Sequence, residues 1–340
     1  MTSFEYVNIL HLGVGNVGRS VMELIKQNHT RIREESWLNL KYCGFFSSTK
    51  GYFYSLGFPD EELYKYNNSA FASSVEEAVN KIPLPFVVID TTASEDTSDI
   101  LIRSLKRGGS VVMSNKRPLS SSQAIFDKFN SWGNRVGYNT TVGAALPIIH
   151  SLKNMLITGD EILEIEGCLS GTLGFVCTAM ENGMSFSSAM KEAMDRKYTE
   201  SDPLEDLAGR DMARKALILA RVMGWKLEID DIMREPFCDV SSIEELSKHD
   251  AEFKKMTEQA ASEKKHMRYV AQLKEGAVKI SLKAVSESSL MSRVRGDNNI
   301  VTFTTRRYSD SPLVIQGPGG GSEITAGGVL TDILSVFKNH

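Results

Sequence analysis

VNILHLGVGNVG, at residues 7–18, begins as an apolar strand and ends in the spacing G-x-G-x-x-G. In this context Gly13 permits a tight turn, Gly15 lets the backbone approach a pyrophosphate, and Gly18 allows close packing of helix on sheet. The helix that follows would add N–H donors and the positive end of its dipole. The stretch predicts a dinucleotide site, and the alternative is an ordinary turn between a strand and a helix.

Strand and helix patterns alternate outward from this stretch over the first third of the chain. Strands are expected at residues 7–12, 40–46, 86–90 and 110–114, and helices at 16–27 and 95–106. Alternation of this kind is typical of β-α-β units, in which helices cover both faces of a parallel sheet.

After residue 140 the pattern changes. Helices dominate up to residue 224, and strands are expected at 162–168, 268–273, 278–285, 300–305 and 313–316. A glycine-rich loop then leads into a final helix. We therefore expect an α/β protein with a Rossmann-type doubly wound parallel sheet over residues 1–137, completed by a helix at 322–340. A second, mixed α+β domain is expected at 138–321.

Composition excludes several classes of protein. The 340 residues include 39 Lys and Arg and 43 Asp and Glu, a balance that argues against a general nucleic-acid binder. No apolar run is long enough for a membrane span, and the N-terminus lacks the basic segment of a secretion signal. We expect a cytoplasmic protein whose four scattered cysteines are small buried hydrophobes rather than metal ligands.

The end of the second expected strand bears on cofactor choice. An NAD site usually has an acidic residue there to hold the ribose 2′-hydroxyl, but residues 44–50 read GFFSSTK. Ser47 and Lys50 suit a 2′-phosphate instead, so NADP is at least tolerated and NAD remains possible. The alternative is that Lys50 is simply a loop charge.

Two charged residues fall on the apolar face of one predicted helix. Asp202 is placed to cap a helix that begins at Pro203 and runs through Val222. Winding it at about 100° per residue gathers its apolar residues on one face, with Asp211 and Lys215 near the centre of that face. The same winding puts Arg210, Arg214 and Arg221 on a different, wetter side.

Burying an unpaired ion is costly, so Asp211 and Lys215 need partners. Either they satisfy each other as a structural salt bridge four residues apart, or their face borders a polar pocket for a zwitterionic ligand. Glu200, just before the helix, would add a second carboxylate to such a pocket.

Lys116 follows the strand at 110–113 directly. Ligands of open parallel sheets bind beyond the carboxyl ends of the strands, which is where Lys116 is expected. A lysine there can donate a proton to a carbonyl oxygen. The alternative is an exposed loop lysine.

These residues lie in segments that, taken together, resemble one family. The segments are the glycine loop, Ser114–Lys116, TVGAALPII at 141–149, EGCLSGTLGF at 166–175, YTESDPLEDLAGRDMARK at 198–215, VIQGPGGG at 314–321 and TAGGVLTDI at 325–333. The chain resembles homoserine dehydrogenase of the short form, which lacks both an aspartokinase domain and a C-terminal regulatory domain.

The resemblance implies an NAD(P)-dependent oxidoreductase that interconverts L-aspartate 4-semialdehyde and L-homoserine in threonine, methionine and isoleucine biosynthesis. It makes Lys116 and Lys215 the proton-transfer lysines, and Glu200 and Asp211 the residues that hold the substrate. It also implies cofactor contacts, at Gly13, Asn16, Val17, Thr92, Lys116 and Gly321. A homodimer through the strands after residue 267 is a further implication.

The family also holds a monovalent cation, commonly sodium. Val142, Ala144 and Leu146 match the positions whose backbone carbonyls bind it. The position of a carboxylate ligand is occupied here by Asn139. An amide oxygen is still a ligand, but one negative charge is lost.

Two other functions remain open at this stage. Another Rossmann dehydrogenase could act on a different amino-acid aldehyde, although a cysteine nucleophile with a histidine base is not evident around Cys168 or Cys177. A non-catalytic, NADP-sensing regulatory protein would keep the fold but would tolerate loss of Lys116 or Lys215.

Overall fold

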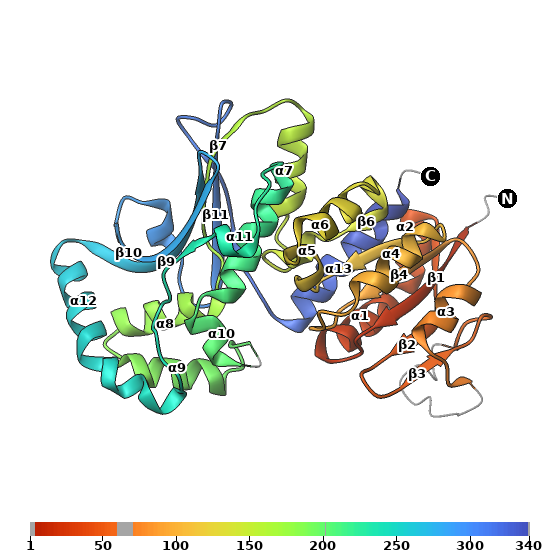
Figure 1. Ribbon diagram of the computed structural model, residues 1–340, viewed down its shortest axis with the longest axis horizontal. Coiled ribbons are helices and arrows are strands. Elements are labelled where there is room, and N and C mark those ends of the chain that lie inside the picture. Colours follow the sequence, from red (N-terminus) through yellow and green to blue (C-terminus); the bar gives the residue numbers. More distant parts are fainter. Residues whose placement is uncertain (1–3, 60–70, 201, 339–340) are drawn as a thin grey trace. The chain divides into compact units, whose positions relative to one another are not determined.

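The computed structural model describes residues 4–59, 71–200 and 202–338, and its contacts divide the chain into two compact units (Figure 1). The first unit comprises Met1–Ala145 together with Gly321–His340, and the second comprises Leu146–Gly320. The second unit is therefore an insertion into the chain of the first.

The first unit alternates strands and helices, as predicted. Its elements are β1 (Glu5–Leu12), α1 (Asn16–Gln27), α2 (His29–Ser36), β2 (Leu38–Phe46), β3 (Gly51–Phe53), α3 (Val75–Lys81), β4 (Phe86–Asp90), α4 (Ser98–Lys106), β5 (Ser110–Met113), α5 (Arg117–Ser120), α6 (Gln123–Asn130), the 3-10 helix η2 (Gly133–Arg135), β6 (Val136–Gly137), the 3-10 helix η3 (Asn139–Thr141) and α13 (Ser322–Phe337).

The sheet of this unit has the strand order β3-β2-β1-β4-β5-β6. Neighbouring strands are parallel except β3, which runs antiparallel to β2 at the edge. The chain leaves β1 toward β2 on one side and later returns to β4 on the other. Such a reversal opens a crevice at the carboxyl ends of β1 and β4, where ligands of open α/β sheets bind. The predicted Rossmann-type fold is confirmed.

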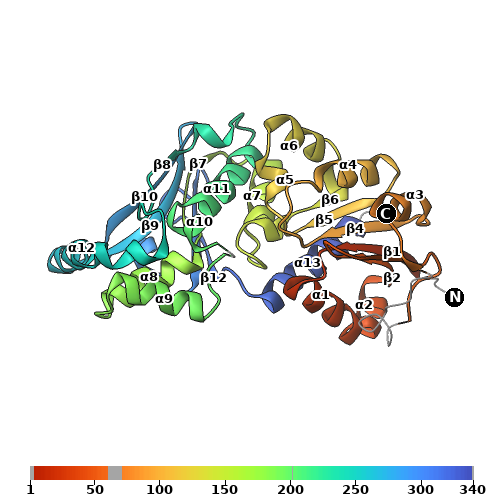
Figure 2. The same ribbon diagram turned by 60° about the horizontal axis from the view of Figure 1, so that its bottom comes forward.

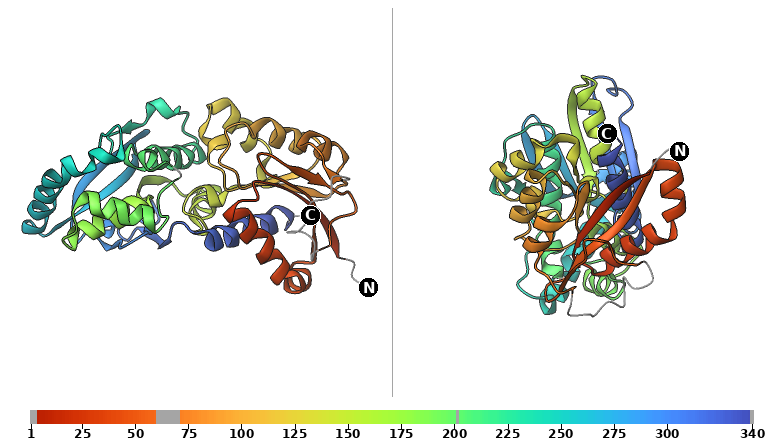
Figure 3. Two further views of the ribbon diagram at one scale, coloured as in Figure 1. Left: turned by 90° about the horizontal axis from the view of Figure 1, so that it is seen from below. Right: turned by 90° about the vertical axis from the view of Figure 1, so that its right-hand side faces the viewer.

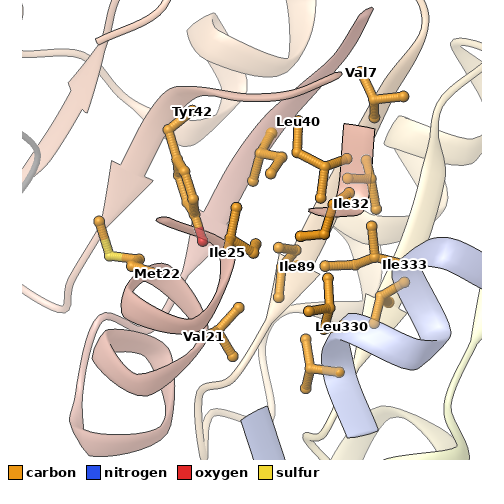
Figure 4. Packing of buried hydrophobic residues seen from close by; sticks show 14 of the residues in the cluster. Val7, Val21, Met22, Ile25, Ile32, Leu40, Tyr42, Ile89, Leu330 and Ile333 are labelled. Carbon is orange, nitrogen blue, oxygen red and sulfur yellow. The ribbon is translucent and has the colours of Figure 1, made fainter. Parts of the chain in front are cut away.

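Helices cover both faces of this sheet (Figures 2 and 3). On one face α1 and α13 lie side by side and pack their apolar side chains against the strands (Figure 4). Val21 and Ile25 of α1 meet Ile89 of β4 and Ile333 of α13 in one buried cluster. Each such side chain contributes about 1.5–3 kcal/mol on burial, so α13 is part of the core of this unit.

In the second unit most helices come first along the chain, and most of the antiparallel strands follow them. Its elements are α7 (Ile148–Ile157), β7 (Ile162–Cys168), α8 (Gly171–Glu181), α9 (Phe186–Asp195), α10 (Pro203–Leu207), α11 (Arg210–Val222), the 3-10 helix η4 (Ile229–Asp231), β8 (Met233–Arg234), the 3-10 helix η5 (Ile243–His249), α12 (Asp250–Ser262), β9 (Lys265–Lys274), β10 (Ala277–Ser286), the 3-10 helix η6 (Leu290–Arg293), β11 (Asn298–Thr305) and β12 (Leu313–Pro318).

The sheet of the second unit has the order β12-β11-β7-β9-β10-β8 and is antiparallel except where β8 joins β10. α8, α11 and α12 pack against it. Within the residues that the structure describes, no helix is both long enough and apolar enough to cross a membrane.

The predicted single helix from Pro203 through Val222 is wrong, because the chain breaks it into α10 and α11 at Gly209. Gly209 has φ +68°, and a Cβ there would lie 2.1 Å from the hydroxyl oxygen of Tyr269. That hydroxyl donates to the carbonyl of Glu235 at 2.6 Å, which holds the tyrosine in place. A left-handed residue at a crowded position needs glycine, and apolar periodicity does not register it.

Arg221 also departs from the prediction that it lies on a wetter side. Its side chain is completely buried, and its guanidinium donates to the carbonyl of Leu227 and to Glu228. The segment after α11 folds back over this end of the helix and supplies the acceptors that a buried guanidinium requires.

A buried histidine connects the strands of the first unit to the glycine loop. His11 at the end of β1 has its Nε2 at 2.9 Å from Thr91 Oγ1 and its Nδ1 at 3.2 Å from the Tyr42 hydroxyl. Thr91 gives its one hydroxyl proton to the carbonyl of Gly13 at 2.6 Å, so it accepts from Nε2–H, and Nδ1 accepts from Tyr42. His11 is therefore a neutral imidazole, and its burial lowers its pKa to about 3.

Acid should destabilise the first unit through His11. The unfolded imidazole takes up a proton near pH 6.5 and the folded one near 3, so stability is lost as pH falls from about 6.5 toward 3. By linkage the loss amounts to roughly 2 kcal/mol at pH 5. His11→Gln should flatten the decline between pH 8 and 5 by about this amount.

In a Trp225→Phe background the two remaining tryptophans, Trp37 and Trp132, report unfolding of the first unit in urea. His29→Gln, at a half-buried histidine on the same unit, is the matched control. An unchanged pH dependence in His11→Gln would show that the imidazole is not held neutral.

Candidate functional site

The glycine loop has the close contacts that a phosphate-binding turn requires. Gly13 has φ +88°, and a Cβ there would lie 2.7 Å from the amide nitrogen of Thr92. At Gly18 a Cβ would lie 2.2 Å from the carbonyl oxygen of Gly13, so α1 sits directly on the turn. Gly15 is the opposite case, because it is exposed and its Cβ position has open space within 4 Å. Backbone N–H groups at Gly15 are therefore accessible to a ligand.

The first turn of α1 favours an anion. By sequence it carries Asn16, Val17, Gly18 and Arg19, so no carboxylate competes with a bound phosphate there. Asn16 is exposed, whereas Val17 packs against the core cluster and anchors the turn. The positive end of this 12-residue helix faces the carboxyl ends of β1 and β4.

A buried carboxylate organises the residues that follow β4. Asp90 is completely buried, and its Oδ1 accepts from the amide of Thr92 at 2.9 Å and from its hydroxyl at 2.7 Å. Its Oδ2 accepts from the Thr97 hydroxyl at 2.7 Å and from Asn115 Nδ2 at 3.0 Å. This network fixes Thr92 and Asn115, and sequence reasoning missed it. Its signal was an acidic residue that ends a wholly apolar strand.

Lys116 follows Asn115 and is the N-cap residue of the short helix α5. It is half-buried, and its carbonyl accepts from the amide and the hydroxyl of Ser120, both at 3.0 Å. Asn115 Oδ1 accepts from the amide of Arg117 at 3.1 Å. The backbone on both sides of Lys116 is thus fixed, unlike that of the exposed loop lysine considered as the alternative.

Ser47 and Lys50 form a tight turn after β2. The amide of Ser47 donates to the Lys50 carbonyl at 2.7 Å, and the Lys50 amide donates to Ser47 Oγ at 3.1 Å. Both residues are exposed. Gly321, another predicted cofactor contact, is exposed at the start of α13 with φ +100° and belongs to the same unit.

The residues predicted to bind a cation fall on both units. Asn139, Val142 and Ala144 are buried in the first unit, and Leu146 begins the second. The Asn139 amide donates to the buried Asp332 of α13 at 2.9 Å. Within the described part of the chain, no group of three or more His, Cys, Asp or Glu side chains could hold a metal, and the four cysteines are buried as predicted.

Asp211 and Lys215 form a buried ion pair on α11. Lys215 Nζ lies 2.7 Å from Asp211 Oδ2 and donates to the carbonyl of Leu169 at 2.7 Å, and about nine-tenths of each side chain is buried. The ion pair is the contact that the structural interpretation expects, and whether a polar pocket borders it depends on the neighbouring side chains.

Asp206 connects Asp211 of this pair to a further acidic residue, Glu200. The buried Asp206 of α10 accepts from the amide of Glu200 at 2.9 Å. Burial raises the pKa of the Asp206 carboxyl to about 7, and the nearby carboxylates of Asp211 and Glu200 add to the rise. Asp206 thus interacts with two other acidic side chains, of which Asp211 is paired with Lys215. An excess of carboxylates suits a ligand with a positive group, which an isolated structural salt bridge would not need.

Sequence reasoning identified Glu200, Asp211 and Lys215 but missed Asp206. Asp206 lies one residue after Glu205, in a helix start rich in acids, where acidic side chains are common for local reasons. Asp206 accepts from the amide of Glu200 six residues earlier, and the break at Gly209 determines how α10 stands to Asp211 on α11. The signal was present in the amino-acid type but not in the periodicity.

Replacing Asp206 by Asn should remove the loss of stability that ionisation of this buried carboxyl causes as pH rises. The folded pKa near 7 exceeds the ordinary value near 3.9, so the stability that protonation provides is fully present below pH 4 and is lost as pH rises to 7. The shift corresponds to roughly 4 kcal/mol at most, so Asp206→Asn should gain stability over wild type between pH 5 and 8. Asn keeps an oxygen for the Glu200 amide.

A Trp37→Phe/Trp132→Phe background leaves Trp225 as the reporter of the second unit in urea unfolding. Asp195→Asn, at an exposed carboxylate on α9, is the matched control. If the stability difference between Asp206→Asn and wild type is the same at pH 5 and 8, the carboxyl is not protonated in the folded chain.

Comparison with known families covers most of the chain. A model described as homoserine dehydrogenase matches residues 147–334, and a model described as its NAD binding domain matches residues 13–139. The homoserine dehydrogenase of Schizosaccharomyces pombe is 32% identical over 98% of this chain and 96% of its own length. A bifunctional aspartokinase/homoserine dehydrogenase of Haemophilus influenzae is also 32% identical over 98% of this chain. This chain spans about two fifths of that relative, 43%.

Solved structures show the same fold. A protein of unknown function from Candida auris has a TM-score of 0.88 at 27% identity and covers 98% of this chain and 99% of its own. A structure described as a putative homoserine dehydrogenase from Archaeoglobus fulgidus has a TM-score of 0.82 at 24% identity, over 97% and 99% of the two chains. On the family models and the S. pombe relative together, the chain belongs to the homoserine dehydrogenase family.

Proposed function

We propose that the protein is an NAD(P)-dependent oxidoreductase that interconverts L-homoserine and L-aspartate 4-semialdehyde, a step of amino-acid biosynthesis. The observation that carries the proposal is the buried Asp211–Lys215 pair with Asp206 and Glu200 beside it. In this family that cluster suits an amino acid as substrate. Oxidation converts the hydroxyl of homoserine to the aldehyde, with one hydride to NAD(P)+ and one proton released.

In the proposed site the carboxylates select the substrate. Glu200 is exposed and Asp211 is buried. In the proposal, one carboxylate at the surface and one in the interior attract the ammonium group of homoserine. Asp206 positions Glu200 through its backbone amide. A ligand ammonium would offset the negative charge of the cluster and lower the pKa of Asp206 from about 7.

Lys215 and Lys116 are proposed as the proton-transfer groups. Lys215 is oriented by Asp211 Oδ2 and by the Leu169 carbonyl, so its ammonium has a defined direction. Lys116 is held by the network of Asp90 and Asn115 at the carboxyl end of β5. In reduction an ammonium of one of these lysines can give a proton to the carbonyl oxygen, and in oxidation its neutral amine form can take the hydroxyl proton.

The first unit is proposed to hold the dinucleotide, whose nicotinamide ring supplies the hydride chemistry when bound. The open backbone at Gly15 and the start of α1 fit a pyrophosphate. Thr92 follows β4 and Gly321 precedes α13 in the same unit, and the exposed Lys50 is available to a 2′-phosphate. The archaeal homoserine dehydrogenase solved with NADPH has the same fold, with a TM-score of 0.77 at 24% identity.

A monovalent cation and a homodimer complete the proposal. The ligands offered by Asn139, Val142, Ala144 and Leu146 are neutral oxygens, which suit Na+ better than a divalent ion. The dimer would form through the sheet of the second unit. The polar side chains of that sheet include Glu164, Glu166 and Gln272. Burial and the neighbouring Glu164 raise the pKa of Glu166.

The test is the initial rate of homoserine oxidation with NADP+ and with NAD+, each in sodium chloride and in choline chloride. Turnover is expected with both cofactors, and a lower rate in choline would support the cation. NADP+ binding without turnover of any amino alcohol would favour the sensing protein. Turnover of another amino alcohol but not of homoserine would favour a Rossmann dehydrogenase of another amino-acid aldehyde.

Lys116→Ala and Lys215→Ala should each lower kcat on the order of a hundredfold or more, the scale of proton-transfer groups. Lys106→Ala and Lys191→Ala, at exposed lysines of the first and second units, should leave kcat within about twofold, since surface side chains contribute little. Circular dichroism and NADPH fluorescence check folding and cofactor binding. Near-normal turnover in either test variant would remove that lysine from the mechanism.

Lys50→Glu should weaken NADP+ more than NAD+. The change replaces an attraction toward the 2′-phosphate by a repulsion, and we expect the KM for NADP+ to rise about tenfold while that for NAD+ changes little. Lys26→Glu, in the last turn of α1, is the matched charge reversal. Equal losses with the two cofactors would refute the phosphate role.

A further inference from the structure

A cavity of about 310 Å³ lies beside α11 in the second unit, outside the cluster around Lys215. Arg210 and Arg214 line it from one row of the helix, and Arg234 of β8 lines it from the sheet edge. Asp211 and Lys215 each stand one residue further along the helix, about 100° around it. The two rows therefore serve different surroundings.

The lining combines positive charge with an apolar wall. Three guanidiniums face one lining carboxylate, Asp230, and the rest of the lining is Ala213, Ile229 and Ile232. Among the lining residues the positive charges therefore exceed the negative ones by two, three against one, while Glu205 and Asp202 interact with Arg210 from outside the lining. Charge of this kind beside an apolar surface fits an organic anion better than a bare inorganic ion.

The guanidiniums keep donors for a ligand. Arg210 Nη1 donates to Glu205 Oε1 at 2.5 Å, and Arg214 Nη1 donates to Glu205 Oε2 at 2.9 Å. Arg234 Nη1 donates to the carbonyl of Ala208. Each contact uses one terminal nitrogen, whereas a guanidinium has five N–H groups in a fork that matches the two oxygens of a carboxylate or phosphate.

We propose that this cavity binds a small organic anion, with a phosphate or carboxylate group on the arginines and a short apolar part on the isoleucines. The anion would compete with Glu205 for Arg210 and Arg214. Glu205 precedes Asp206 on α10, and Asp206 holds the Glu200 amide. Occupancy of the cavity therefore loosens α10 and weakens substrate binding, a consequence that rests on the proposed function.

Isothermal titration with phenyl phosphate and with benzoate measures binding directly and distinguishes the two anion types. Sodium chloride at matched ionic strength controls for screening, and saturating NADP+ fills the cofactor's own phosphate subsites. Saturable binding of one molecule per chain is expected for wild type. Absence of saturable binding of either probe overturns the proposal.

Arg234→Gln removes one charged donor, and its affinity for the bound probe should fall about tenfold. Ile229→Glu puts a carboxylate at the exposed rim of the cavity, and its affinity for the probe should fall at least as far. Because Ile229 is exposed, the substitution carries little risk to folding. Arg31→Gln, at an exposed arginine of the first unit, should bind as wild type does. Equal binding by all four proteins means that the probe binds elsewhere and overturns the proposal.

The coupling is measured as the KM for homoserine. Saturating probe should raise it about fivefold in wild type with kcat little changed, and should have no such effect in Ile229→Glu. An unchanged KM in wild type with bound probe overturns the coupling. Failure of the proposed function would appear differently, as no turnover in any protein, with the titration results unaffected.

Discussion

The arrangement of the second unit depends on the burial of an ammonium group in its interior. Removing Lys215 and Asp211 from water costs several kcal/mol per ion, and their mutual attraction offsets this only where further polar partners complete the contacts. The Leu169 carbonyl is one such partner, and it is supplied by the segment between β7 and α8. Gly209 separates α10 from α11, and burial together with the nearby Asp211 raises the pKa of Asp206 on α10. Asp206 is therefore an unfavourable neighbour of the pair, and a ligand ammonium would offset its effect.

In the first unit, neutral side chains are the partners of the buried polar and charged groups. Its turn at Gly13 is fixed by backbone contacts and by the chain from Tyr42 through His11 to Thr91. The one buried carboxylate in that region, Asp90, is surrounded by hydroxyl and amide donors rather than by a cation. The positive end of α1 contributes to the potential at the turn, which suits a ligand whose charge is carried by phosphate.

Much of the fold could be predicted because local signals agree with the tertiary structure. The glycine spacing, the apolar strands and the i, i+4 relation of Asp211 and Lys215 all act within a few residues. Two features that were missed depend on partners outside the helix concerned. Tyr269 reaches Gly209 across 60 residues, and the acceptors that bury Arg221 lie beyond the end of its helix. Helix periodicity depends only on the residues of the helix itself and does not report partners outside it. The break at Gly209 and the burial of Arg221 therefore could not be predicted.

The insertion of one unit into the other has a consequence for biosynthesis of the chain. α13 follows all of Leu146–Gly320, yet it fills the core of the first unit through Val329 and Ile333 and anchors Asn139 through Asp332. While the ribosome makes the chain, the inserted unit emerges whole before the first unit has its last helix. The first unit meanwhile exposes the apolar groove that α13 will cover, and such surfaces are where chaperones bind and where nascent chains aggregate. The unit whose synthesis begins first is thus the last to reach its native structure.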